Sequence, residues 1–493
     1  MNTLRILVSL FSVLALGATA TTARAEVTPA AFDLAAIRNP ATLETRVVQD
    51  WQPAPKDKAI RQKLVEITIC EWWSGQKVRL PVTFNAPASG AVCRHVIIGN
   101  MGLALRPTLP TGAMLRLLKE DGVGVVLVGM STIDAMAPAG KLHVGMKAHL
   151  LQTKDTRYTP AWIWGLSDMR ALTAAIAESG VFQPAKVLAT GGSKRGVGAA
   201  VAGIWDDRFT AIMPVVAPPL GNPGGAYVGG TDPAEITAAN AAFLAELAAG
   251  KHPSLPSTAR AALIDRDERR GNERITADAA RTAGWSAEEI SALNEHAWEA
   301  CWTTKYLPAL KKRGLEIFYN VGTNDSVSPG LVDLGKRFPD FPIFIVPGGQ
   351  HGGPKDSGFT RQVPTLPEVE DNLYAFAQHH FFGARPLVAP PKVQTTWDAK
   401  GRTVRVTVTF ADGTEPQKNS VSWSANRHRP YTLAFEYDRW QTAELSRTGA
   451  ATYSGTITVE AGAQTVEVVT NHTHTTKNLP LSFSSPLLRV ATK

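Results

Sequence analysis

Four short runs of apolar residues, separated by segments long enough for helices, lie between residues 95 and 216. Glycine-bounded runs rich in valine and isoleucine are typical of parallel strands covered on both faces. The intervening segments 111–119 and 165–179 carry apolar residues at helical spacing. This alternation predicts a doubly wound, mostly parallel sheet, which binds ligands at the carboxyl ends of its strands. The predicted strands are 95–99, 124–128, 187–189 and 211–216, preceded by antiparallel runs at 63–68 and 76–84.

The heptapeptide Thr190-Gly-Gly-Ser-Lys-Arg-Gly196 stands between the third predicted strand and a helix-compatible run. Such a turn holds the hydroxyl of Ser193 clear of its neighbours, and the unpaired N–H groups of the new helix point at the same spot. Serine nucleophiles usually occur in G-x-S-x-G, which Gly191 fits and Arg195 does not. We expect Gly196 to allow the close approach of helix and strands instead. An ordinary strand-to-helix turn is the alternative interpretation.

Two later predicted strands, 315–319 and 341–346, end in loops that contain Asp325 and His351. A serine hydroxyl needs an imidazole to take its proton and a buried carboxylate to orient that imidazole. The chain order serine, acid, histidine is the order in which a sheet of this winding brings these residues to one edge. We therefore predict a catalytic triad of Ser193, Asp325 and His351.

Each of the two later residues also has an ordinary explanation. Asp325 suits an Asn-Asp turn, and His351 lies in a glycine-rich stretch typical of surface loops. The separation, 351 − 325 = 26 residues, leaves room for one helix, at 329–337, and one strand. The joint occurrence of acid and base after consecutive strands favours the triad.

An oxyanion hole requires two N–H donors near the nucleophile. The backbone N–H of Lys194 is the first predicted donor, because it directly follows Ser193. The second should come from the loop after strand 95–99, where Met101 is the first choice and Asn100 the next. The side chains of Lys194 and Arg195 could attract an acidic substrate group, but at a first helical turn we expect them to face solvent or pair with a carboxylate.

The remainder of the chain predicts an insertion and a second domain. Residues 221–312 begin with a Gly/Pro-rich stretch and continue with helical segments, which favours a cap over the catalytic edge. A purely structural elaboration of the fold is the alternative interpretation. A closing helix, 365–380, completes a domain of residues 26–385, and a proline-rich linker, 386–392, follows. Residues 393–493 show period-two alternation, typical of an antiparallel β-sandwich. The helical segments of the cap are 234–248, 258–264 and 286–298, and its aromatic residues, which could line a pocket or belong to the core, are Trp285, Trp298, Trp302 and Tyr306.

Composition argues against several other functions. Lysine and arginine exceed aspartate and glutamate by 51 − 43 = 8, but they form no stripe interleaved with aromatics, so no nucleic-acid partner is expected. His472 and His474 share a strand face without a third ligand nearby, so we predict no metal, and the proposed chemistry needs no cofactor. Cys70, Cys93 and Cys301 allow at most one internal disulfide, and buried thiols are the alternative.

The first 25 residues have the pattern of a cleavable signal peptide. Residues 1–5 are basic, residues 6–20 are largely apolar, and Ala23-Arg-Ala25 has the small-x-small form of a cleavage site. The apolar run is interrupted and short for a membrane span, and no later run reaches about 18 residues. We expect a periplasmic or secreted protein without stable membrane insertion; its oligomeric state stays open.

The chain resembles the PhoPQ-activated pathogenicity-related (PqaA-type) proteins over about residues 50 to 485. That resemblance implies an exported α/β-hydrolase fold with a β-domain after the core, and it implies that Arg195 is a family trait, because the family elbow reads G-x-S-K-R-G. The tryptophan-rich stretch 70–73 departs from the family pattern, so the resemblance implies no particular substrate. The matching segments are 190–196, 322–325, 346–351 and 421–425.

Two functional hypotheses follow. The first is an exported serine hydrolase that cleaves an ester or amide bond in a small-molecule or peptide substrate through an acyl-enzyme. The alternative is a non-catalytic or virulence-associated binding protein of the same fold, whose β-domain binds an envelope, glycan or host partner. A flat exposed platform formed by Trp423, Tyr431 or Trp440 would favour this alternative. The β-domain could also simply brace the cap or drive dimerisation.

Overall fold

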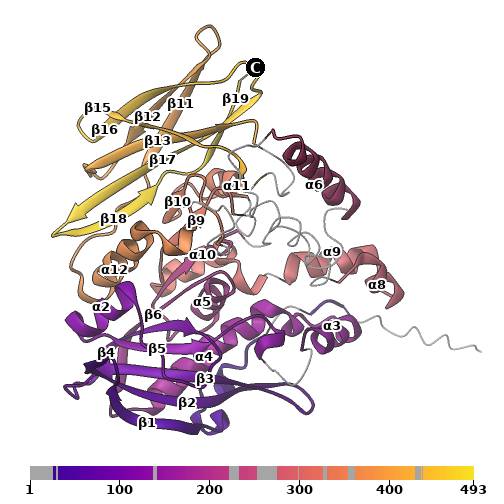
Figure 1. Ribbon diagram of the computed structural model, residues 1–493, viewed down its shortest axis with the longest axis vertical. Coiled ribbons are helices and arrows are strands. Elements are labelled where there is room, and N and C mark those ends of the chain that lie inside the picture. The colour runs from indigo at the N-terminus through magenta and orange to yellow at the C-terminus, as the bar shows by residue number, and fades with distance from the viewer. Residues whose placement is uncertain are drawn as a thin grey trace, which may run out of the picture.

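The computed structural model describes residues 26–28, 31–136, 142–220, 233–251, 275–297, 299–325, 330–352, 361–427, 435 and 437–492. It is a mixed α/β structure with a large, mostly parallel sheet and a C-terminal antiparallel β-domain (Figure 1). The predictions made for residues 1–25, 221–225 and 258–264 lie outside the described residues. Within these ranges, no helix combines the length and the apolar composition needed to cross a bilayer.

The central ten-stranded sheet opens with antiparallel strands. Strands β1 (Arg46–Ala54), β2 (Asp57–Trp73) and β3 (Gln76–Pro87) pair in turn, and β3 then pairs antiparallel with β5 (Gly124–Gly129). The sequence did not predict β1. Most of its side chains are exposed at the sheet edge, so it lacks the apolar pattern of the other strands.

The remaining strands are parallel, in the spatial order β5-β4-β6-β7-β9-β10, and β8 pairs with β7. The chain passes from β4 to β5 on one side and then to β6 on the other, which makes the β4–β6 border the switch point where such sheets bind ligands. The predicted strand 315–319 is interrupted at Phe318. The strands are β4 (Cys93–Met101), β6 (Phe182–Gly192), β7 (Ala211–Val215), β8 (Glu316–Ile317), β9 (Tyr319–Gly322) and β10 (Ile343–Val346).

Helices cover both faces of this sheet. Helices α4 (Pro160–Ala177) and α5 (Lys194–Trp205) pack against each other on one face, and α2 (Gly112–Asp121) and α12 (Pro367–Phe382) do so on the other. Because successive strand residues point to opposite faces, Ile98 belongs to the first core and Ile97 to the second. The other helices that accompany the sheet are α1 (Leu34–Arg38), α3 (Leu142–Thr153), α11 (Leu331–Arg337) and the 3-10 turns η1 (Pro40–Leu43), η2 (Asp134–Met136), η3 (Thr156–Tyr158) and η5 (Val363–Thr365).

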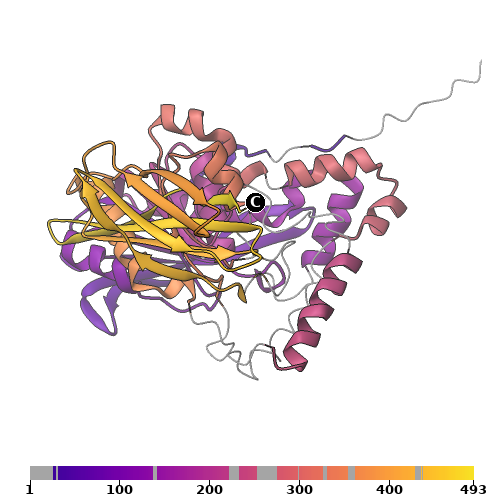
Figure 2. The ribbon, with the colours of Figure 1, turned by 90° about the horizontal axis from the view of Figure 1, so that it is seen from above.

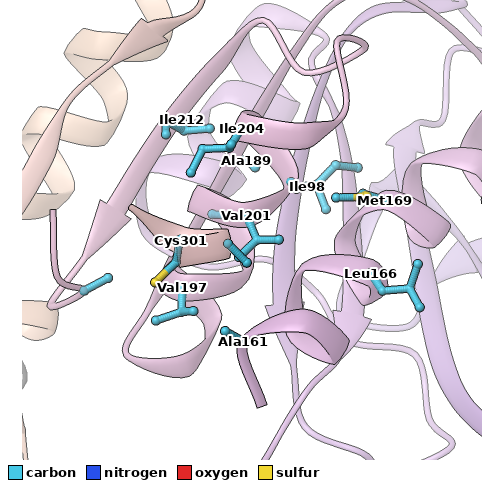
Figure 3. Close-up of a cluster of buried hydrophobic side chains, with 14 of the residues drawn as sticks. Ile98, Ala161, Leu166, Met169, Ala189, Val197, Val201, Ile204, Ile212 and Cys301 are labelled. Atoms are coloured by element: carbon cyan, nitrogen blue, oxygen red, sulfur yellow. The ribbon is translucent and has the colours of Figure 1, made fainter. Parts of the chain in front are cut away.

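The core beneath α5 fixes where that helix begins. Figure 3 shows Val197, Val201 and Ile204 of α5 packed among side chains of α4 and of the sheet. Gly165 of α4 permits this packing, because a Cβ there would lie 2.1 Å from Val201 Cγ1. The start of α5 is therefore held from below by a closely packed interior.

The insertion between β7 and β8 is helical where the structure describes it. Helices α6, α8 and α9 lie on the same side of the molecule as α3 (Figures 1 and 2). Trp285 is buried and its indole N–H donates to the carbonyl of Leu151, so it anchors the insertion to α3. Tyr306 donates to Glu299, and Trp298 lies outside the described residues. The described elements are α6 (Pro233–Ala248), α8 (Ala277–Thr282), α9 (Ala287–His296), η4 (Glu299–Cys301) and α10 (Thr303–Arg313).

The C-terminal domain consists of two antiparallel sheets. Inward-facing valines such as Val406 and Val468 join them in one buried cluster, as the period-two pattern predicts. The first sheet contains β11 (Lys392–Asp398), β12 (Thr403–Thr409), β16 (Thr452–Thr458) and β15 (Ser446–Gly449). The second contains β14 (Gln441–Glu444), β13 (Lys418–Ala425), β17 (Thr465–Thr476), β18 (Leu479–Ser484) and β19 (Leu488–Ala491).

Strand β18 docks this domain on the edge of the central sheet, next to β10 and α12 (Figure 1). The N–H of Ile345 donates to Ser484 Oγ at 2.8 Å, and Asn471 Nδ2 donates to the Ile345 carbonyl at 2.7 Å. The N–H of Ser482 donates to Asn372 Oδ1 at 2.7 Å. The domain therefore covers the sheet edge at β10 and shares buried hydrogen bonds with the central sheet.

Cys70, Cys93 and Cys301 form no disulfide bond. Cys93 and Cys301 are buried, and Cys70 is partly buried. Burial raises the pKa values of Cys70, Cys93 and Cys301 to about 12, 11 and 12. The cysteines therefore act as small hydrophobic residues of the interior, which was the alternative to an internal disulfide.

Candidate active site

Ser193 occupies a sharp turn between the end of β6 and the start of α5. Its backbone has φ 61° and ψ −129°, a region that residues with a side chain rarely adopt. The Ser193 N–H donates to the carbonyl of Val215 at 2.9 Å. The close approach predicted at Gly196 is present, because a Cβ there would lie 2.7 Å from the Gly191 carbonyl and 2.9 Å from that of Val215. The turn is therefore held in an unfavourable conformation by rigid backbone on several sides.

The structure brings Ser193, His351 and Asp325 together in one chain of hydrogen bonds. His351 Nε2 lies 2.6 Å from Ser193 Oγ, and Nδ1 lies 3.1 Å from each carboxylate oxygen of Asp325. Asp325 is fully buried, whereas the His351 side chain is 27% exposed. When Nδ1 carries a proton and donates it to the carboxylate, Nε2 is the acceptor for the serine hydroxyl. This geometry can transfer a proton from Ser193 to His351.

Asp325 lies in the loop after β9 (the acid loop), and His351 lies in the loop after β10 (the base loop). These two strands are parallel neighbours, and their last residues, Gly322 and Val346, are in register. The Thr323 N–H donates to the Val346 carbonyl at 3.0 Å, and Thr323 Oγ1 accepts from the Gly348 N–H at 2.8 Å. A Cβ on Gly322 would lie 2.2 Å from the carbonyl oxygen of Gly349, so only glycine fits there. The two loops therefore form one tightly joined unit.

The two predicted oxyanion donors lie at the same edge of the sheet as Ser193. Lys194 is the first residue of α5, and Met101 is the last residue of β4, the strand next to β6. The carbonyl of Met101 accepts from the Met130 N–H, and its Sδ accepts from Thr83 Oγ1 at 3.2 Å. The donor roles of the Lys194 and Met101 N–H groups stay predictions.

The side chain of Arg195 bonds to a backbone carbonyl, in contrast to our expectation that it would face solvent or pair with a carboxylate. Its Nε and Nη2 donate to the carbonyl of Met130 at 3.3 and 3.2 Å. Burial lowers the pKa of this guanidinium. Met130 directly follows β5, so Arg195 connects the first turn of α5 to the end of a strand two places away in the sheet. The residue that breaks the usual elbow pattern thus supports the elbow.

Asp168, on α4, is a part of the site that the sequence did not single out. Asn100 Nδ2 donates to Asp168 Oδ1 at 3.2 Å, and Asn100 Oδ1 lies 2.4 Å from where a Cβ on Gly191 would be. Asp168 is 1% exposed, and burial raises its pKa well above the usual range. The buried Asp168 carboxyl group therefore holds the side chain of Asn100 near the end of β4. The single acidic residue of a largely apolar helix was the sequence signal for it.

The aromatic platform considered for the β-domain is not formed by the described residues. Trp423 is only 9% exposed, and the Trp440 indole N–H donates to Asn324 Oδ1 at 2.9 Å. Tyr431 lies outside the described residues. Trp423 and Trp440 therefore do not form a flat exposed surface.

Of the two histidines considered as metal ligands, His472 is already hydrogen-bonded within the domain. His472 is buried, and its two ring nitrogens lie 2.8 Å from Asn419 Oδ1 and Thr470 Oγ1. Burial lowers the pKa of His472 to about 3. Across the ranges that the structure describes, no group of three histidine, cysteine, aspartate or glutamate side chains is arranged to hold a metal ion.

No protein-family model and no curated protein matches the sequence, so the resemblance to the PqaA-type proteins stays a prediction. The chain is similar to solved structures of an acetyl xylan esterase from Paenibacillus sp. R4, with TM-score 0.41, 14% identity, and coverage of 70% of this chain and 92% of that one. A glucuronoyl esterase from Solibacter usitatus has TM-score 0.37, 14% identity, and coverage of 68% and 86%. Est1E from Butyrivibrio proteoclasticus has TM-score 0.30, 12% identity, and coverage of 62% and 95%. Because these TM-scores are below 0.5, the function proposed below is based on the geometry of the chain itself.

Proposed function

We propose that this chain is a serine hydrolase that cleaves an ester or amide bond through an acyl-enzyme, with Ser193 as nucleophile, His351 as general base and Asp325 as the carboxylate that orients it. The observation that carries this proposal is the continuous hydrogen-bonded chain from Asp325 to Ser193, with Ser193 in a strained strand-to-helix turn. A buried carboxylate, a partly exposed imidazole and an activated hydroxyl at one sheet edge match the requirements of acyl transfer.

In the first half-reaction, Ser193 Oγ forms a bond to the substrate carbonyl carbon as its proton passes to His351 Nε2. The imidazolium is stabilised by the Asp325 carboxylate, which accepts from Nδ1. Collapse of the tetrahedral intermediate breaks the bond to the alcohol or amine, and that leaving group takes the proton from Nε2. An acyl-serine remains.

In the second half-reaction, a water molecule gives a proton to His351 Nε2 while its oxygen attacks the acyl carbon. The bond from that carbon to Ser193 Oγ breaks, and the serine regains the proton, so the enzyme returns to its initial state. We assign the stabilisation of the oxyanion in both steps to the N–H groups of Lys194 and Met101, with Asn100 as the alternative second donor.

The proposed architecture is an α/β-hydrolase fold, residues 26–385, with a helical cap at about 221–312 and a β-sandwich at 393–493. The support for it is the strand order, with the nucleophile after β6, the acid after β9 and the histidine after β10. Export through a signal peptide at residues 1–25, to the periplasm or beyond, and membership of the PqaA-type family belong to the same proposal.

Labelling of the purified protein with a fluorophosphonate probe tests the proposal. Wild-type protein should be labelled at Ser193, and Ser193→Ala should abolish labelling. Ser89→Ala is the matched control, because Ser89 is exposed and far along the chain from the proposed triad. Labelling that persists in Ser193→Ala, or a wild type that is neither labelled nor active on a panel of esters and amides, would reject the assignment.

A further inference from the structure

We propose that the C-terminal β-domain is part of the catalytic apparatus, because Arg427, Asp438 and Trp440 position the loop that carries Asp325. This inference rests on the proposed role of Asp325. It departs from the interpretation of the domain as a separate binding module or a brace for the cap.

Asn324, the residue before Asp325, is held by the β-domain at both ends of its amide. Its Oδ1 accepts from Trp440 Nε1 at 2.9 Å and from Arg427 Nη2 at 3.2 Å, and its Nδ2 donates to the Asp438 carbonyl at 2.7 Å. Arg427 Nη2 also donates to the carbonyl of Thr323. Asn324 is 3% exposed, so these bonds are shielded from water. The β-domain thus fixes both the side chain and the backbone directly before the acid.

The residue that makes most of these contacts is itself rigidly held. The Arg427 side chain is 2% exposed, and it is bonded to Glu467 at 2.8 Å and to Asp438 at 3.2 Å. Its guanidinium lies over the rings of Phe435 and Trp440, 4.3 and 5.1 Å from their centroids. Glu467 belongs to β17 in the middle of the second sheet. The contacts to the acid loop are therefore anchored on the sheet of the domain.

Trp440 also adjoins the loop that carries the base. A Cβ built on Gly348 would have Trp440 Cδ1 as its neighbour at 3.8 Å. The Gly348 N–H donates to Thr323 Oγ1, and the Asn324 N–H donates to the Gly349 carbonyl at 2.9 Å. One side chain of the β-domain thus lies against both loops. Because triad geometry has to be kept within about half an ångström, such outer contacts set the efficiency of the proton transfer.

The test uses Trp440→Phe in the full-length protein, which keeps an aromatic ring and removes the N–H bond to Asn324. The matched control is Trp397→Phe, in β11 of the same domain, because its indole nitrogen is buried without a partner among the described residues. Trp440→Phe should lower kcat about tenfold at an unchanged KM, whereas Trp397→Phe should change neither. Arg427→Lys, which retains the charge but loses the planar fork, should also lower kcat.

A double-mutant cycle separates positioning from a general loss of structure. If Trp440 acts through Asp325, Trp440→Phe should cause no further loss of rate in an Asp325→Asn background. The inference would be overturned if Trp440→Phe had the kcat of the wild type, or if Trp440→Phe lowered kcat by the same factor in the wild type and in Asp325→Asn. Either result would leave the proposed function standing.

A wild type without labelling or turnover would instead reject the proposed function. The far-downfield proton signal of His351 Nδ1 then tests the positioning by itself. It should be present in wild type and Trp397→Phe, and weakened or lost in Trp440→Phe; an unchanged signal would overturn the inference.

Discussion

His351 Nε2 lies 2.6 Å from Ser193 Oγ, although 158 positions of the chain separate the two residues. Ser193 follows β6 and His351 follows β10, and β7 and β9 lie between these strands in the sheet. The hydrogen bond between His351 and Ser193 therefore requires the loop after β10 to extend along the sheet edge past β9 and β7. That loop is joined to the acid loop and, through it, to the β-domain. Catalysis, as proposed, should respond to substitutions in each of these supports.

The first prediction concerns Asp325→Asn. The asparagine has nearly the same shape, but its amide donates where the carboxylate accepts from His351 Nδ1, so the imidazole is held in the wrong tautomer. We expect kcat to fall by a factor on the order of 10⁴ with little change in KM. Steady-state kinetics on a fluorogenic ester measures both quantities. A loss of less than tenfold would mean that another group orients the histidine.

The second prediction concerns Gly196→Ala. The added methyl group would meet the carbonyl oxygens of Gly191 and Val215 and the Cβ of Ala217, all within 3.0 Å, and backbone cannot rotate aside. We expect the free energy of unfolding to decrease by about 3 kcal/mol. Urea unfolding gives this value, with Gly180→Ala as the control, since nothing lies within 4 Å of a Cβ at that position. Equal stabilities for the two variants would contradict the close approach.

The central features of the fold could be predicted because they are local. Most of the parallel strands contain a buried apolar run, and Ser193, Asp325 and His351 lie in the turns or loops that follow three of these strands. The mostly parallel sheet and the antiparallel β-domain are accordingly confirmed. The edge strand β1 was missed because an exposed strand has no apolar signature.

The residues that support the site could not be predicted, because their partners are distant in sequence. Arg195 donates to Met130, 65 positions earlier, and the acceptor is a carbonyl, which every residue possesses. Arg427 reaches the carbonyl of Thr323, 104 positions earlier, only because the β-domain docks next to β10. No local pattern encodes such contacts, so they require the packed structure.

The third prediction concerns the buried carboxyl group of Asp168. Burial raises its pKa in the folded protein, whereas the unfolded chain ionises above about pH 3.9, so folding takes up a proton and stability falls as pH rises. Asp168→Asn removes this cost and should be more stable than wild type at pH 7, with the difference vanishing near pH 4. Urea unfolding at the two pH values measures it.

Asp57→Asn is a control of opposite sign to Asp168→Asn. A hydrogen bond from Lys119 lowers the pKa of Asp57, so its contribution to stability is present above about pH 3.9, and the variant should be less stable than wild type at pH 7. If Asp168→Asn were also the less stable protein at pH 7, Asp168 would have to be ionised in the folded state.

The fourth prediction concerns Glu316 at the start of β8, which accepts from His380 Nδ1 at 2.9 Å and lies 3.2 Å from His379 Nε2. Burial alone would raise the pKa of Glu316, but the bonds to both histidines outweigh it and lower the pKa to about 2. Its hydrogen bond to Glu316 raises the pKa of His379. The ionised Glu316 carboxylate stabilises the folded protein fully above about pH 4.3, and this stabilisation is lost as the pH falls toward 2. The protonated His379 stabilises the folded protein fully below about pH 6.5, and this stabilisation is lost as the pH rises through the raised pKa of His379.

Both contributions are complete between about pH 4.3 and 6.5, so Glu316→Gln should destabilise the protein most in that window and less at pH 9. Because the Glu316 side chain is 35% exposed, solvent screening limits the effect to about 1 kcal/mol. Urea unfolding at pH 5.5 and pH 9 measures the change. Glu415→Gln removes an exposed pair with Arg447, which stays charged at both values, so its effect should not depend on pH. A Glu316→Gln effect that is equally large at pH 9 would show that the carboxylate acts without a charged histidine.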